Sequence, residues 1–82
     1  MNVGMLWFDN DSKTGLTAKV ERAADYYRHK YGFAADLCLV HPTMLVEPRP
    51  EIVESRGGKV AVRANRAILP GHLWIGVEDQ KE

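Results

Sequence analysis

The stretch GLTAKVERAADYYRHKY, residues 15–31, has the clearest periodicity in the chain and decides its fold class. Its apolar side chains recur at helical spacing and line one stripe: Leu16, Val20, Ala23, Ala24, Tyr27 and Tyr31. Ser12, Thr14 or Thr17 would cap the start, and Gly32 follows as a stop signal. The segment therefore predicts an amphipathic helix of about four turns with one face on a core.

Short apolar runs lie on both sides of this helix. Residues 4–8 and 36–40 contain the runs GMLWF and LCLV, which lack alternation and are typical of strands buried on both faces. A strand, a helix and a second strand predict a β-α-β unit with parallel strands. The runs KVAVRA and HLWIGV, residues 59–64 and 72–77, predict two further strands, which we expect to pair as an antiparallel hairpin.

These elements predict an α+β fold in a single domain over residues 1–82, with one long helix on one face of a mixed sheet of three or four strands. Residues 42–58 hold three of the four prolines and predict an irregular excursion, and residues 78–82 form a short acidic tail. Because one helix covers only one sheet face, the 42–58 segment, a second copy of the chain or a partner must cover the other. We expect a homodimer or a protein partner on the open sheet face.

The composition is that of a globular domain, with 82 residues of which 45% are hydrophobic, and with 11 basic and 11 acidic side chains. Cys38 is the only cysteine, which excludes an intramolecular disulfide and a cysteine-rich zinc site and favours a reducing cytoplasm. No apolar run approaches the roughly 20 residues that span a bilayer, and the first residues lack the positive region of an export signal. We expect a cytoplasmic protein with no membrane association and no cofactor.

The zero net charge is unevenly distributed. Residues 13–76 hold ten Lys or Arg against six Asp or Glu, and the two ends hold five acidic residues against one Lys. The basic middle of the chain has one candidate surface beside the apolar stripe of the predicted helix, where five side chains share a sector: Lys19, Arg22, Tyr26, His29 and Lys30.

Arg63, in the strand predicted at residues 59–64, adds to the positive charge. Basic side chains with an interleaved tyrosine suit phosphate contact and base stacking, so these six residues are a candidate nucleic-acid surface. The alternative is an ordinary solvated helix face.

Carboxylates and imidazoles follow the predicted strands. Asp9 and Asp11 come after the first strand and His41 after the second, so they would meet at one sheet edge if these strands are parallel neighbours. Two carboxylates and an imidazole would hold a divalent metal or act as an acid and a base. His72, at the start of the last strand, forms a second such set with His41 and Asp9. The alternative is that residues 9–12 are only the polar turn that starts the helix.

Two function classes follow. The preferred one is a small non-catalytic module that binds itself or a partner and possesses a candidate nucleic-acid surface. The alternative is a small metal-assisted hydrolase or nuclease using Asp9 and Asp11 with His41 or His72. Trp7 and Trp74 are expected in the core, unless they lie on the uncovered sheet face, where they would indicate a binding surface. Cys38 is expected to be a buried, inert thiol.

Overall fold

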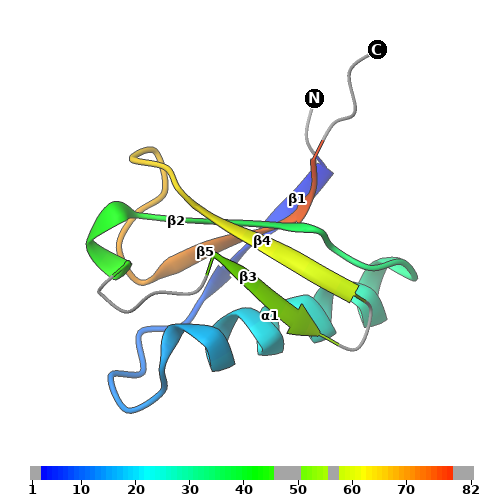
Figure 1. The fold of residues 1–82 in the computed structure, drawn as a ribbon, viewed down its shortest axis with the longest axis horizontal. Coiled ribbons are helices and arrows are strands. Elements are labelled where there is room, and N and C mark those ends of the chain that lie inside the picture. Colours follow the sequence, from blue (N-terminus) through cyan, green and yellow to red (C-terminus); the bar gives the residue numbers. More distant parts are fainter. Residues whose placement is uncertain (1–2, 46–50, 56–57, 79–82) are drawn as a thin grey trace.

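The computed structural model describes residues 3–45, 51–55 and 58–78 (Figure 1). In chain order the elements are β1 (Val3–Phe8), α1 (Leu16–Tyr31), β2 (Leu37–Val40), the 3₁₀ helix η1 (Pro42–Met44), β3 (Ile52–Ser55), β4 (Gly58–Ala64) and β5 (His72–Val77). The strands form one mixed sheet in the order β1-β5-β2-β4-β3, and α1 lies along one of its faces. The α+β class is confirmed, with five strands in the sheet instead of three or four.

The helix α1 forms where the apolar period predicts it. Val20, Ala23, Ala24 and Tyr27 are buried against the sheet, and Gly32 ends the helix in the left-handed conformation with φ 81°. Its start differs from the expectation, because the N-cap residue is Gly15 and no side chain caps it. No helix in the described part of the chain is long and apolar enough to cross a membrane.

The strand order corrects two predictions. β1 and β2 run parallel, since both are antiparallel to β5, but β5 lies between them and they are not neighbours. The two strands that were expected to form a hairpin, β4 and β5, do not pair, because β2 separates them. The physical reason is burial: β5 is apolar on both faces, so it takes a central place between two other apolar strands.

The strand missing from the sequence prediction, β3, lies within the expected irregular segment 42–58. It pairs antiparallel with β4, from Ile52 opposite Ala61 to Ser55 opposite Gly58, and so supplies the hairpin that was expected elsewhere. Val53 is buried, which ties this short strand to the core. Pairing with β4 therefore forms a strand where the surrounding prolines and glycines predict irregular structure. Residues 46–50 of the expected irregular segment lie outside the described part of the chain.

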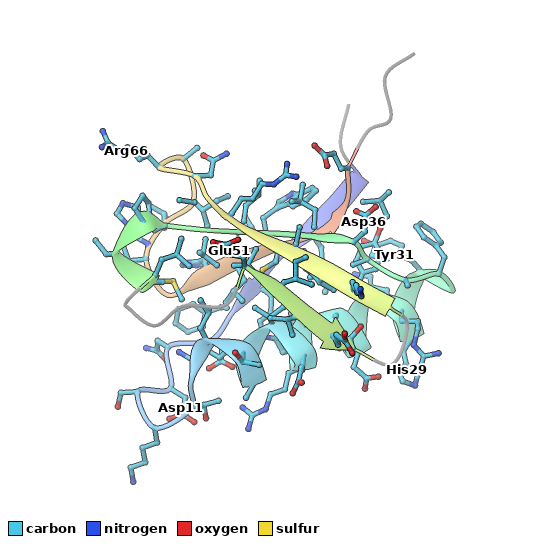
Figure 2. All side chains as sticks on the ribbon, in the orientation of Figure 1. Asp11, His29, Tyr31, Asp36, Glu51 and Arg66 are labelled. Atoms are coloured by element: carbon cyan, nitrogen blue, oxygen red, sulfur yellow. The ribbon has the colours of Figure 1, made fainter. Side chains whose placement is uncertain are left out.

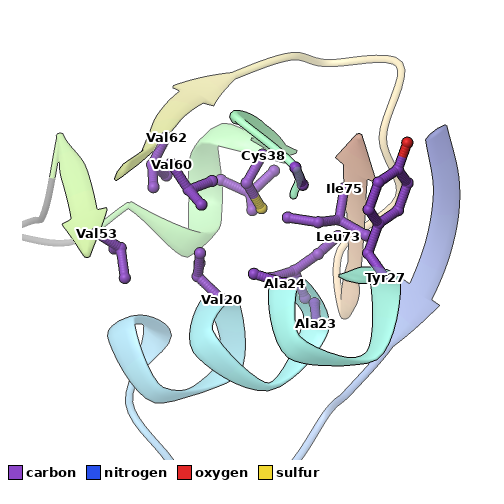
Figure 3. Close-up of a cluster of buried hydrophobic side chains, with 12 residues drawn as sticks. Val20, Ala23, Ala24, Tyr27, Cys38, Val53, Val60, Val62, Leu73 and Ile75 are labelled. Atoms are coloured by element: carbon purple, nitrogen blue, oxygen red, sulfur yellow. The ribbon is translucent and has the colours of Figure 1, made fainter. Parts of the chain in front are cut away.

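The core lies between α1 and the sheet (Figure 3). Every strand from β2 to β5 contributes side chains to it: Cys38, Val40, Val53, Val60, Val62, Leu73 and Ile75. They meet the buried side of α1, where Val20, Ala23 and Tyr27 have no exposed surface. α1 thus covers one face of the sheet. We call the opposite face the outer face, and no helix of the described part of the chain lies over it.

Candidate functional site

The acidic residues after β1 are occupied in building the turn that starts α1. Asp9 accepts a hydrogen bond from the Asp11 backbone N–H at 3.1 Å. Asp11 accepts from the Lys13 N–H at 2.9 Å and from the Thr14 hydroxyl at 2.7 Å. These hydrogen bonds, that of Thr14 first, lower the pKa of the Asp11 carboxyl. Figure 2 shows Asp11 below the start of α1, away from the sheet. Both carboxylates therefore act as turn-forming groups.

The two histidines do lie at the same end of the sheet as Asp9, as one of the predicted metal sets requires. Val40 is opposite Leu73, which brings His41 and His72 to this end, and Asp9 N–H donates to the Gly71 carbonyl at 2.9 Å. His41 Nδ1 accepts from the Thr43 N–H at 3.2 Å and caps η1.

His72 Nδ1 lies 3.3 Å from the Pro70 carbonyl oxygen, to which it can donate. Because β5 separates β1 from β2, Asp9 and His41 belong to strands about two strand spacings, or roughly 10 Å, apart. Among the described residues, no group of three or more His, Cys, Asp or Glu side chains is placed to hold a metal ion. The geometry therefore gives the metal-assisted alternative no support.

The predicted nucleic-acid residues of α1 are largely engaged within the chain. Lys19 is only 8% exposed, and its Nζ donates to the Asp9 carbonyl at 3.0 Å. Arg22 pairs with the Asp9 carboxylate at 3.8 Å. The Tyr26 ring packs on Trp7 with centroids 5.1 Å apart. Lys19 is therefore withdrawn from the surface, whereas Arg22 and Tyr26 remain exposed beside their partners.

The remaining members of that set lie on two elements, α1 and β4. His29 lies 3.8 Å from the Asp25 carboxylate, and Lys30 lies over the Tyr31 ring, 5.5 Å from its centroid. Arg63 belongs to the sheet and pairs with Glu78 at 3.2 Å. Arg63 therefore lies in the sheet, whereas the five other predicted residues belong to α1 and share one sector of it.

Cys38 is buried in β2, and burial raises the pKa of its thiol to about 12. A hollow of about 660 Å³ opens between α1 and the end of β3, and Asp25 and Arg28 in its lining pair with each other at 3.8 Å. Its one hydroxyl, that of Ser55, donates to the Gly58 carbonyl at 3.0 Å. No nucleophile next to a base occurs among the described residues of this lining.

The outer face carries a group of neighbouring apolar side chains, two of which are exposed. Side chains alternate along a strand, so the buried Leu73 and Ile75 place Trp74 on the outer face. The register sets Trp74 beside Leu6 of β1 and Leu39 of β2.

Leu6 is 60% exposed and Phe8 is 59% exposed, although both belong to a strand without a charged residue. Leu39 and Trp74 are half-buried. Leu6, Phe8, Leu39 and Trp74 form what we call the outer patch.

The Trp74 indole lies against the sheet over β1. A Cβ built on Gly4 would overlap the Trp74 ring carbon Cζ2 and would stand 2.6 Å from the Ile75 carbonyl oxygen. The absence of a side chain at Gly4 therefore lets the indole lie flat beside Leu6. The Phe8 ring in turn packs on His72, with centroids 4.9 Å apart. The outer patch is thus a preformed, closely packed surface.

Charges border the outer patch in matched pairs. Arg63 of β4 pairs with Glu78 at the end of β5. Because β2 lies between β4 and β5, this ion pair crosses the outer face near Leu37. Leu37 is only 3% exposed, although its register places it on that face. Farther along β4, Lys59 is opposite Glu54. Among the described residues of the outer face, Arg63 and Lys59 each therefore have an acidic neighbour that balances their charge.

No protein-family model matches the chain, and neither the curated proteins nor the solved structures contain a significant match to it. The candidate site therefore rests on the geometry of this chain. Sequence reasoning had placed Trp74 in the core and had not singled out Leu6 or Phe8. The alternation in HLWIGV, once Leu73 and Ile75 are taken as inward, is the signal that places Trp74 outside.

Proposed function

We propose that this domain is a non-catalytic interaction module that self-associates through the outer patch. The observation that carries the proposal is the exposure of Leu6 and Phe8, both close to 60%, next to the half-buried Trp74. A contiguous apolar surface of this kind on a small domain is typical of a protein-binding site.

The apolar area supports a weak association. Fully burying a Leu or Phe side chain contributes about 1.5–3 kcal/mol, so removing the exposed 60% and 59% of Leu6 and Phe8 from water contributes roughly 1–2 kcal/mol each. Two copies double that sum, and Leu39 and Trp74 add to it. Because association costs at least about 4 kcal/mol of lost translational and rotational freedom, roughly 0–4 kcal/mol remain from Leu6 and Phe8, and we expect a dissociation constant from the high micromolar to the millimolar range.

The charge distribution favours a protein over a nucleic acid as the partner. Binding to a phosphate backbone requires unpaired basic side chains on one surface. Arg63 pairs with Glu78, Lys59 is opposite Glu54, and Lys19 is buried. A second copy of the chain, by contrast, needs an apolar surface without net charge, as the outer patch provides.

The test is the oligomeric state of wild type and of a Phe8→Ser variant, measured by sedimentation over about 1–500 μM protein. We expect wild type to associate with rising concentration and Phe8→Ser to stay monomeric or to associate at least about tenfold more weakly. The matched control is Phe33→Ser, which removes a 50% exposed phenyl ring from the loop after α1. Circular dichroism checks that both variants fold.

Two outcomes would overturn the proposal. One is a wild-type chain that remains monomeric over the whole concentration range. The other is an equal loss of association in Phe8→Ser and Phe33→Ser, because this would mean that the outer patch has no special part in the contact. Binding of single-stranded oligonucleotides at low salt, with the chain monomeric, would instead support the nucleic-acid hypothesis.

A further inference from the structure

The edge of the sheet at β1 has unpaired backbone groups. In the described part of the chain β1 pairs with β5 alone and ends the strand order. Asp9 N–H donates to Gly71, so the alternation of an antiparallel ladder directs the N–H groups of Met5 and Trp7 toward β5 as well. The N–H and C=O groups of the intervening residues therefore point to the free edge; these residues are Gly4, Leu6 and Phe8.

This edge lacks the usual protection against strand pairing. Natural edge strands are short, or carry a charge, a proline or a bulge. The segment Val3–Phe8, VGMLWF, has six residues, no charge and no proline, and it pairs with β5 in continuous register. The opposite edge, β3, has four residues and includes Glu54. The β1 edge is therefore open to pairing with another strand, whereas the short length and the charge of β3 oppose such pairing.

We propose that β1 pairs antiparallel with β1 of a second copy, about a two-fold axis at Leu6. The proposal rests on the proposed self-association and gives it a geometry. Because the outward backbone groups of Leu6 face each other across the axis, the pair forms reciprocal N–H···O=C bonds. The two five-stranded sheets then become one continuous sheet, with both α1 helices on the same face.

The side chains of β1 are complementary to themselves in this register. Phe8 lies opposite Gly4 of the second copy, where its ring meets the edge of the Trp74 indole that covers Gly4. A large aromatic side chain opposite glycine is a favourable cross-strand pair. On the helix side of the sheet, Trp7 lies opposite Met5 of the second copy, and a thioether next to an aromatic ring is also favourable.

The absence of charge on β1 points to a second copy as the occupant. A two-fold axis places each residue near its own counterpart, so self-pairing requires a stretch without charge, and Val3–Phe8 meets that requirement. A weak, reversible dimer is therefore expected.

The first experiment uses the wild-type chain and follows residue-resolved amide hydrogen exchange by NMR at low and high protein concentration. We expect the outward amides of Leu6 and Phe8 to exchange about tenfold more slowly when about 90% of the chain is dimeric. The amides of Met5 and Trp7, which already bond to β5, serve as the internal control. Sedimentation of the same samples gives the dimer fraction.

The second experiment places a single cysteine on the proposed axis. Directly opposite residues in such a pair have Cα atoms about 5.5 Å apart, within the range of a disulfide. We expect Leu6→Cys to form a covalent dimer in oxidised glutathione. The matched control is Ile52→Cys, because Ile52 is 58% exposed and lies on the opposite edge strand. Cys38 is buried in both variants.

The outcomes separate this inference from the proposed function. A concentration-dependent dimer with unprotected Leu6 and Phe8 amides would overturn the edge pairing and leave self-association through the outer patch intact. Protected amides without a Leu6→Cys cross-link would overturn the register centred on Leu6. A chain that stays monomeric at every concentration would overturn both proposals.

Discussion

At the scale of single residues, the outer patch depends on Gly4, because a side chain there would overlap the Trp74 ring. The Trp74 ring and the Ile75 carbonyl occupy the space that a Cβ would take. The ring lies flat only because nothing projects from Gly4, and this arrangement shapes the surface next to Leu6. In the sequence Gly4 is simply the start of an apolar run, and its contact with Trp74 depends on the pairing of β1 with β5.

We predict that Gly4→Ala destabilises the domain by about 1–3 kcal/mol, although alanine is ordinarily better than glycine in a strand. The measurement is urea unfolding followed by circular dichroism. The control is a double-mutant cycle with Trp74→Ala, in which part of the cost of Gly4→Ala should disappear because the ring is gone, while the overlap with the Ile75 carbonyl remains. An unchanged cost in the Trp74→Ala background would contradict the overlap with the ring.

For Asp9 and Asp11, some contacts can be predicted from the sequence and others depend on the tertiary structure. Asp-Asn-Asp before a helical period permits either a turn or part of a metal site. Asp11 hydrogen bonds to Lys13 and Thr14, which are local contacts, and the turn interpretation could be reached from the sequence. The position of the histidines relative to Asp9 could not, because it depends on which strand lies between β1 and β2.

At the scale of elements, α1 and β3 differ in how far local sequence determines them. The helix has sixteen residues with a regular apolar stripe and a glycine stop, so its period alone predicts it. β3 has four residues, and only Val53 among them is buried. A strand this short is formed by its ladder with β4, and the segment therefore has too weak a local pattern to predict.

We predict that Gly32→Ala lowers the free energy of unfolding by about 1 kcal/mol, because Gly32 has φ 81° and its N–H bonds to the Arg28 carbonyl at the end of α1. Apart from its two chain neighbours, no described residue has an atom within 4 Å of the position that a Cβ would take, so the cost arises from the backbone. Gly32→Asn should cost less, since asparagine tolerates the left-handed region better. Thermal unfolding of the two variants tests this order, and equal losses would refute the backbone explanation.

At the scale of the whole molecule, the described residues build one core between α1 and the sheet and leave the outer face without a covering layer. The side chains of the outer patch lie on β1, β2 and β5. The inward side chains of the same strands pack in or against the core. Self-association would therefore bury a surface that the chain cannot cover with its described residues. The contact would involve the uncharged strand β1 and the outer patch, with few charged side chains.

We predict that self-association depends little on ionic strength. Raising NaCl from about 50 to 500 mM should change the dissociation constant by less than about twofold, because salt screens charge interactions and leaves apolar and backbone contacts in place. Sedimentation at the two salt concentrations measures the change. A tenfold weakening at high salt would mean that charged side chains, such as those of α1, carry the contact.

The sequence by itself determined the helix, four of the strands and the α+β class, because these depend on apolar period and on contacts close along the chain. The tertiary structure alone decided that β5 separates β1 from β2, that β3 pairs with β4, and that Trp74 lies over Gly4. These features depend on which strands pair, and hydrogen bonds between strands far apart in the chain leave no mark on local periodicity. The candidate surface belongs to this second group, since Leu6, Phe8 and Trp74 become neighbours only through the pairing of the first strand with the last.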